Sequence, residues 1–320
     1  MFYLRVIKLL MFVVLGLISL NSLAIAAPLK PTSLTWTVPA GSNNTGLDGT
    51  STKPYKDDVL LETLVFNGFT YERSESSFVR VLRAMVLTNR DAINAEYGDL
   101  DSNSDGNATP FVKAGIIPEG TALPDATRES VDPAIQDAAI AHAFDSFSLV
   151  EGVDGEGANY SMRLIFDKGI VDNSLEADFL PELVFFERGS NSSFSIRAII
   201  GGTWDAPTYA PLTVSILTTN LWASNLYIDT IEIGSGQRLG VAGIDLNDFW
   251  TAGNAPEAVF GYELTSLNSS GADVYGQFMS AESWRQFVNL PDGLAIPEPG
   301  SIALFGLGFG VLVLRRRKRV

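Results

Sequence analysis

The stretch PELVFFERGSNSSFSIRAIIGG, residues 181–202, decides the class of fold. It contains two short runs, residues 183–187 and 194–200, rich in the Val, Phe and Ile side chains that β-strands favour. Gly189, Ser190 and Asn191 separate the runs, and two glycines close the second one. Glycine and small polar residues at such points are typical of turns between strands. The stretch therefore predicts two consecutive β-strands.

Similar apolar runs separated by turn residues continue on both sides of this stretch. Further candidate strands are residues 161–166, 212–217, 225–233, 239–246 and 259–267. Residues 59–71 predict a buried strand pair and residues 78–86 another strand, and residues 28–56 are compatible with one edge strand. Many short strands at this spacing are typical of an antiparallel β-sandwich, here of jelly-roll type.

One segment has the pattern of a helix. Asp132 followed by Pro133 supplies an N-cap acceptor and a first residue with helical φ. Apolar residues then recur at spacings of three and four, which predicts one buried helix face: Ile135, Ala139, Ile140, Ala143, Phe144 and Phe147. Residues 88–96 are compatible with a second, short helix. The predicted fold class is therefore mainly β with a few short helices.

Two segments, residues 72–78 and 187–194, resemble each other: each begins Glu-Arg, continues with serines and ends at Phe before a predicted strand. They are compatible with equivalent hairpins in two halves of a duplicated sandwich. A chance similarity is the alternative, so one sandwich and a duplicated one both stay open.

Composition excludes several classes of function. The 320 residues include no cysteine and a single histidine, His142, so disulfides, thiolate metal sites and multi-histidine zinc sites are excluded. The net charge is −15, and seven of the 22 basic residues lie in the two terminal segments. The body, residues 28–296, then carries 15 basic and 36 acidic residues, about −21. Such a body repels the phosphates of nucleic acid, so we expect no nucleic-acid partner.

The N-terminus has the three parts of a secretory signal peptide, residues 1–27. Arg5 and Lys8 supply the charge, residues 9–20 the apolar core, and Ala24 and Ala26 the small-x-small site that signal peptidase requires. A retained N-terminal membrane anchor is the alternative. After the signal peptide we expect a polar segment at 28–56, a β-rich domain at 57–288 and a spacer at 289–296.

The C-terminus, residues 297–320, also has three parts. Pro297, Glu298 and Pro299 come first, and the uncharged run 301–314 follows. The last part is a basic cluster of Arg315, Arg316, Arg317, Lys318 and Arg319. Fourteen helical residues span only about 21 Å, which makes 301–314 a marginal transmembrane segment. The basic cluster should stay cytoplasmic, which places the Pro-Glu-Pro motif at the outer face of the inner membrane.

This ordered tail resembles the PEP-CTERM sorting signal. In that family an exosortase, a membrane protease-transpeptidase, processes the tail at or near the motif. The resemblance implies that exosortase is a partner and that the body lies on the periplasmic side before it reaches the cell surface or the extracellular matrix. It also implies a Gram-negative host that makes exopolysaccharide. A simple C-terminal tail anchor is the alternative. Residues 181–189 and 243–249 are similar to exosortase-dependent surface proteins, a group that implies no catalytic activity.

One compact group of oxygen donors is a candidate calcium site: Asp99, Asp101, Asn103 and Asp105. Asp101, Asn103 and Asp105, followed by Gly106, match the opening of an EF-hand-like loop. Val112 stands where the bidentate Glu should be, so a polar surface turn is the alternative.

Aromatic residues near predicted loops are candidates for stacking on sugars: Trp204, Trp222 and Trp250. Burial in the core is the alternative for each. The carboxylate pairs Asp245 with Asp248 and Glu182 with Glu187 could in principle act on a glycoside, but an acidic chain contains such pairs by chance. No nucleophile elbow, P-loop or dinucleotide motif is present.

These observations favour a surface or matrix protein that is not an enzyme. A carbohydrate-binding β-sandwich module is the rival, and a glycoside-acting enzyme is the third class considered.

Overall fold

The computed structural model describes residues 27–73, 79–98, 132–155, 157–172, 180–230, 235–251, 258–269, 271–277 and 286–294. The predicted signal-peptide cleavage site, the 99–105 loop and the sorting tail lie outside these ranges. None of the helices within the ranges is long and apolar enough to cross a membrane.

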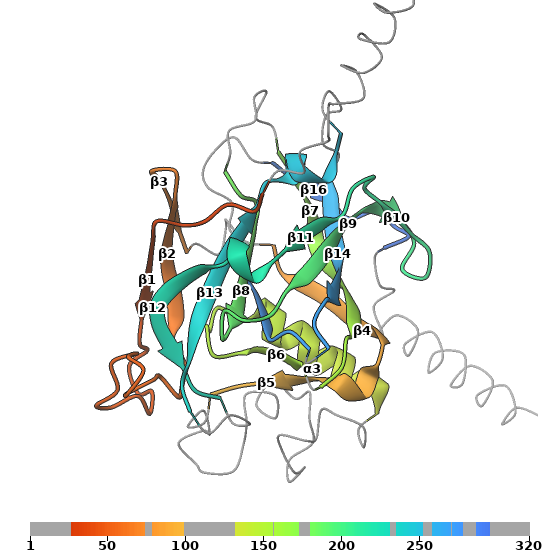
Figure 1. Cartoon of the computed structure of the whole chain (residues 1–320). Coiled ribbons are helices and arrows are strands. Elements are labelled where there is room, and N and C mark those ends of the chain that lie inside the picture. The colour runs from red at the N-terminus through yellow and green to blue at the C-terminus, as the bar shows by residue number, and fades with distance from the viewer. Residues whose placement is uncertain are drawn as a thin grey trace, which may run out of the picture.

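Three antiparallel sheets make up the body (Figure 1). The largest has seven strands in the order β10-β9-β14-β7-β16, with β11 also paired to β9 and β4 to β7. Its strands are β4 (Val81–Thr88), β7 (Ser161–Val171), β9 (Phe194–Gly202), β10 (Pro207–Tyr209), β11 (Val214–Ile216), β14 (Val259–Ser266) and β16 (Gln286–Asn289).

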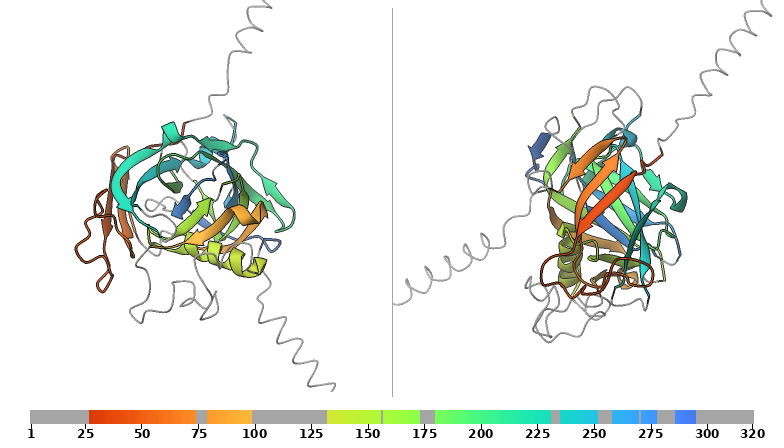
Figure 2. Two further views of the ribbon diagram at one scale, coloured as in Figure 1. Left: turned by 60° about the horizontal axis from the view of Figure 1, so that its bottom comes forward. Right: turned by 90° about the vertical axis from the view of Figure 1, so that its left-hand side faces the viewer.

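The second sheet has six strands in the order β12-β13-β8-β15-β6-β5. They are β5 (Ile93–Glu96), β6 (Gly152–Gly155), β8 (Leu183–Arg188), β12 (Trp222–Ile228), β13 (Gln237–Ile244) and β15 (Val274–Gln277). A small sheet of β1 (Ser33–Thr37), β2 (Leu60–Phe66) and β3 (Phe69–Glu72) lies at one side of the molecule (Figure 2). The helical elements are α3 (Pro133–Asp145) and the short 3-10 turns η2 (Arg90–Ala92), η4 (Thr218–Asn220) and η5 (Leu246–Phe249).

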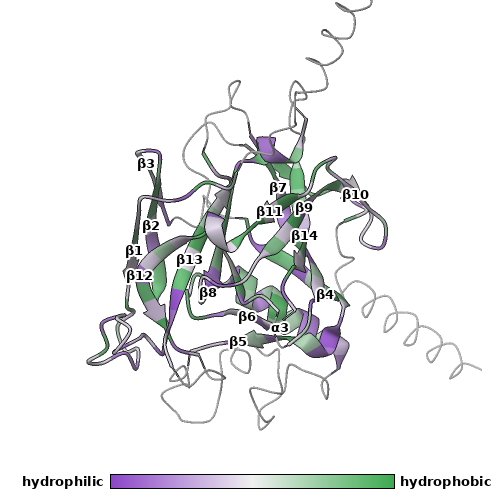
Figure 3. Cartoon of the chain, viewed as in Figure 1, coloured by the Kyte–Doolittle hydropathy of each residue, from purple (hydrophilic) through white to green (hydrophobic). Residues whose placement is uncertain are grey.

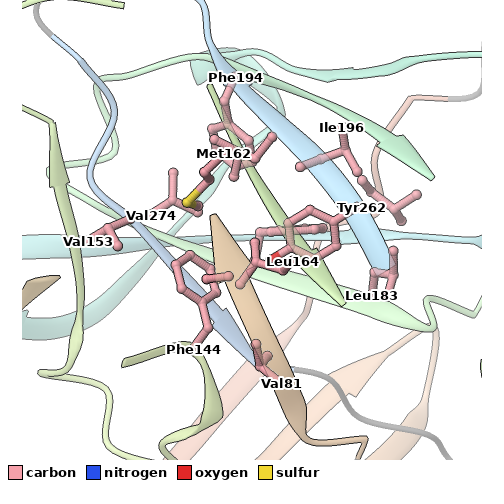
Figure 4. Close-up of a cluster of buried hydrophobic side chains, with 14 of the residues drawn as sticks. Val81, Phe144, Val153, Met162, Leu164, Leu183, Phe194, Ile196, Tyr262 and Val274 are labelled. Atoms are coloured by element: carbon pink, nitrogen blue, oxygen red, sulfur yellow. The ribbon is translucent and has the colours of Figure 1, made fainter. Parts of the chain in front are cut away.

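The seven- and six-stranded sheets share one central core, which α3 also enters (Figure 4). Its members include Val81, Phe144, Val153, Met162, Leu164, Leu183, Phe194, Ile196, Tyr262 and Val274. The ring of Phe185 meets the edges of Phe194 and Tyr262, with centroids 5.8 and 5.3 Å away. Edge-to-face aromatic contacts of this kind stabilise a core beyond the area that they bury.

Strand β8 is buried on both faces because it separates two cores. Leu183 and Phe185 lie in the central core, whereas Val184 and Phe186 lie in a side core with residues of the three-stranded sheet such as Phe66. Successive strand residues point to opposite faces, so the unbroken apolar run of β8 serves both cores. In Figure 3, green apolar stretches lie along β13 next to a purple hydrophilic end, the polar start of the strand at Gln237 and Arg238.

The expectation of a mainly β body with antiparallel sheets is confirmed. The predicted strands all occur, although β11 is shorter than predicted and β12 begins earlier, at Trp222. The jelly-roll topology and the duplication stay predictions. The interpretation of residues 187–194 as a hairpin is wrong, because β8 and β9 belong to different sheets.

Two further expectations need correction. Residues 88–96 form no α-helix: after the turn η2, the chain enters strand β5, whose four residues are all buried and pair with β6. The predicted spacer, residues 289–296, is also too long. Residues up to Leu294 belong to the body, since β16 pairs with β7 and Leu294 is buried.

The predicted helix start is confirmed, because the side chain of Asp132 accepts a hydrogen bond from the Ala134 N–H at 2.8 Å. Asp132→Ala should therefore lower the free energy of unfolding by about 1 kcal/mol, the usual effect of a lost N-cap. Asp132→Asn keeps an acceptor oxygen and should stay within a few tenths of the parent value. Urea denaturation of the purified body measures both, and equal losses in the two variants would contradict the capping role.

Candidate functional site

Arg188, at the end of β8, is the centre of a buried ionic cluster. Its guanidinium, 1% exposed, contacts Glu96 and the Thr230 hydroxyl, and donates to Asp154 at 2.6 Å and to Asp273 at 3.0 Å. We call these five residues the Arg188 cluster. Strand pairing brings them together: Glu96 ends β5, Asp154 lies in β6 and Asp273 directly precedes β15.

The Arg188 cluster has more carboxylates than cations. Burial raises the pKa of Asp273 to about 7, although Arg188 opposes the shift. Burial also raises the pKa of Glu96, again against the attraction of Arg188. The neighbouring Glu187 has a pKa well above its ordinary value because it is buried and faces Asp273, while its carboxylate accepts from the N–H groups of Asn191 and Ser192. Burial therefore favours the neutral form of these three carboxyl groups, while Arg188 favours their charged form.

A second group, the carboxylate trio, consists of Asp172, Glu182 and Asp245. All three are buried, and one ligand oxygen from each lies within 4.8 Å of the others. Glu182 immediately precedes β8 and Asp245 immediately follows β13, two strands paired through Leu183 and Ile244. Asp172 directly follows β7, so the trio joins the ends of strands from both large sheets.

Amide donors from the turn η5 hold the trio. The Leu246 N–H donates to Glu182 at 2.7 Å, and the Asn247 N–H donates to Asp245 at 2.8 Å. The Asn247 side chain bridges Asp172 and Asp245, at 2.8 and 2.9 Å. Beside them, burial and the charge of Asp245 raise the pKa of Asp248 to about 7. An all-oxygen set of three carboxylates is the chemistry that could hold a hard cation such as Ca²⁺.

The three candidate sugar-stacking tryptophans differ in exposure. Trp204 and Trp250 are only 9% and 8% exposed, and the guanidinium of Arg83 lies over the Trp204 ring, 3.8 Å from its centroid. Stacking on a pyranose needs an open ring face. Trp222, at the start of β12, is half-buried against the side core. Trp204 and Trp250 are therefore buried in the body, and their ring faces are not open to a sugar.

His142 lies on α3 with its Nε2 atom 3.8 Å from a carboxylate oxygen of Glu151. Burial lowers its pKa, while Asp145 raises it and Arg80 lowers it further. Burial therefore favours the neutral imidazole, and the histidine lies beside the buried face of the helix.

Sequence patterns alone did not show either buried cluster. The pairs considered for a glycosidase were Asp245 with Asp248 and Glu182 with Glu187. The structure brings Asp245 near Asp248 and also near Glu182, and it places Glu187 near Asp273 and Arg188. One signal could have found two members of the trio: once β8 and β13 are paired antiparallel, Glu182 and Asp245, the residues beyond Leu183 and Ile244, must meet. The predicted calcium loop, residues 99–105, lies outside the described residues, and calcium binding there stays a prediction.

The comparisons with known proteins identify the class of protein through its tail. Residues 295–318 match the family model of the PEP-CTERM protein-sorting motif, which confirms the resemblance drawn from Pro297, Glu298 and Pro299. No curated protein and no solved structure matches the chain. The motif indicates an exosortase-targeted secreted surface protein.

Replacing Arg188 tests the importance of the Arg188 cluster. Arg188→Met leaves Glu96, Asp154 and Asp273 buried without their cation, so the free energy of unfolding should fall by about 3–5 kcal/mol at pH 8. The loss should be smaller at pH 5, where the carboxylates can protonate. Arg238→Met, at an exposed position on β13, should cost no more than about 0.5 kcal/mol. Equal losses in the two variants at both pH values would refute the role of the cluster.

The raised pKa of Asp248 predicts a pH-dependent stability. Its folded pKa, about 7, lies above its ordinary value of 3.8, so the folded state binds more protons between these values. Stability should therefore fall as pH rises from 4 to 7. Asp248→Asn removes this dependence and should raise the melting temperature at pH 8 by roughly 3 °C, with little change at pH 4. Thermal scans at both pH values measure the difference, and an equal effect at the two would contradict the assignment.

Proposed function

We propose that this protein is an exported cell-surface or extracellular-matrix protein without enzymatic activity, which exosortase processes and which associates with exopolysaccharide. The observation that carries the proposal is the PEP-CTERM motif at residues 295–318, which begins directly after the last described residue of the body, Leu294. In this proposal the body first stands on the periplasmic side of the inner membrane, and the tail is its anchor until processing.

The other end of the body is compatible with removal of a signal peptide. Leu29 exchanges two backbone hydrogen bonds with Gly243, at 2.7 and 2.8 Å. Signal peptidase acting after Ala26 would leave this pairing intact, because the proposed mature chain begins near Ala27. A chain that begins there still contains every described element of the body.

Two observations support a role without catalysis. His142, the single histidine of the chain, lies on α3 with its Nε2 atom 3.8 Å from a carboxylate oxygen of Glu151. Burial is the main cause of its lowered pKa. Its geometry is that of a packed helix residue. The carboxylates of the Arg188 cluster and of the trio are bound by arginine, hydroxyl, asparagine and backbone donors, which are contacts that support strand ends. Association with exopolysaccharide rests on the family that the tail resembles.

Changing the motif tests the sorting proposal. A variant with Pro297, Glu298 and Pro299 all replaced by Ala should be exported normally but should accumulate in the inner membrane with its tail uncut. Membrane fractionation and C-terminal mass spectrometry of the host's protein measure this. The matched control replaces Pro118 and Glu119 by Ala, which removes a Pro-Glu pair from elsewhere in the chain and should leave processing unchanged. Normal cleavage of the motif variant would refute the proposal.

A further inference from the structure

The last nine described residues, 286–294, form a C-terminal strap docked on the seven-stranded sheet. Strand β16 pairs antiparallel with β7, from Gln286 opposite Val171 to Asn289 opposite Lys168 (Figure 1). The Lys168 ammonium lies 4.6 Å from the centre of the Phe287 ring, a cation–π contact across the same pair of strands. The strap is therefore part of the sheet.

The end of the strap is buried against the body. Leu294 is 1% exposed and packs in an outer cluster with Ile165, Ile199, Trp204 and Phe260. Its neighbour Gly293 accepts a hydrogen bond from the Trp204 N–H at 3.0 Å. A Cβ atom on Gly293 would lie 2.6 Å from the carbonyl oxygen of Gly202, so only glycine allows this close approach.

Two arginines contact Trp204, the aromatic residue against which Leu294 packs. Arg163, 7% exposed, donates to the Trp204 carbonyl oxygen at 2.5 Å and forms an ion pair with Glu263 at 2.9 Å. The Arg83 guanidinium covers the Trp204 ring. Because both arginines contact Trp204, the position of this indole does not depend on the strap alone.

Covalent geometry then limits how far the sorting motif can be from the body. Pro297 is three residues beyond Leu294, so the chain can separate the two by at most about 10 Å. Ser301, the start of the predicted membrane segment, is seven residues beyond Leu294, at most about 25 Å. A peptidase that acts at the motif must reach an extended segment within this narrow gap between the body and the bilayer.

We propose that the C-terminal strap controls access to the sorting motif: exosortase processes the tail efficiently only when residues 286–294 have left the body. This inference rests on the proposed function. Release of the nine residues would lengthen the tether by about 30 Å and provide the extended chain that a protease active site binds. The body would then set the rate of its own processing through the population of the undocked strap.

A disulfide lock tests the proposal, because the chain has no cysteine to compete with it. Lys168→Cys together with Asn289→Cys places two thiols opposite each other on β7 and β16, where directly opposed Cβ atoms lie about 5 Å apart. The oxidising periplasm should close the bond. The matched control is Thr35→Cys with Thr63→Cys, two residues opposed on β1 and β2 whose hydroxyls lie 2.6 Å apart.

In pulse-labelled cells of the host, the strap-locked form should be processed at least about tenfold more slowly than the parent, and growth with dithiothreitol should restore the rate. The control lock should be processed at the parent rate. A strap-locked, oxidised protein that is processed as fast as the parent overturns the inference while the proposed function stands. If the parent and the Pro297–Pro299 alanine variant are processed alike, the proposed function itself fails.

A second variant loosens the strap. Leu294→Ala removes most of a buried side chain and should raise the undocked population, and with it the processing rate, by about tenfold or more when undocking limits the reaction. The matched control is Leu267→Ala, a leucine that is 44% exposed after β14, and it should leave the rate unchanged. A Leu294→Ala protein that folds and is processed no faster than the parent would contradict undocking as the limiting step.

Discussion

The guanidinium of Arg188 is the contact on which the six-stranded sheet depends. One buried cation serves Glu96, Asp154 and Asp273, and so connects strands β5, β6, β8 and β15. A buried charge without partners is very costly, so any arrangement that separates these strands must also expose Arg188. Side chains alternate along a strand, and a slip of one residue would turn Arg188 away from its carboxylates. The ion pairs therefore fix the register of β8.

That register in turn positions both cores. Phe185 meets Phe194 and Tyr262 in the central core, while Phe186 packs in the side core against residues of the three-stranded sheet. The same register brings Glu182 to Asp245 at the other end of β8. There the backbone N–H groups of η5 donate hydrogen bonds to the two carboxylates. One strand thus carries an ionic cluster at each end and an apolar core on each face.

The PEP-CTERM motif and the proposed signal-peptide site both lie close to residues that pack in this body. Leu29 is paired with Gly243 close to the proposed signal-peptide site, and Leu294 is buried two positions before Ile296, which directly precedes the Pro-Glu-Pro motif. In the inference drawn above, processing at the tail depends on the packing of the folded body as well as on the motif. The hydrophobic cluster around Trp204 links the two, because its member Leu294 is the last residue before the matched motif.

Sequence alone determined the sorting tail, the mainly β character and the start of α3, because each depends on order or spacing along the chain. The tail is recognised by three successive segments, the strands by the turn residues between them, and the helix start by Asp132 and Pro133. It could not assign strands to sheets, which is why residues 187–194 suggested a hairpin and residues 88–96 a helix. The Arg188 cluster, the carboxylate trio and the docking of Leu294 arose only in the tertiary structure. Each joins residues that are distant in sequence, and which ones meet depends on the pairing of strands and on burial rather than on local pattern.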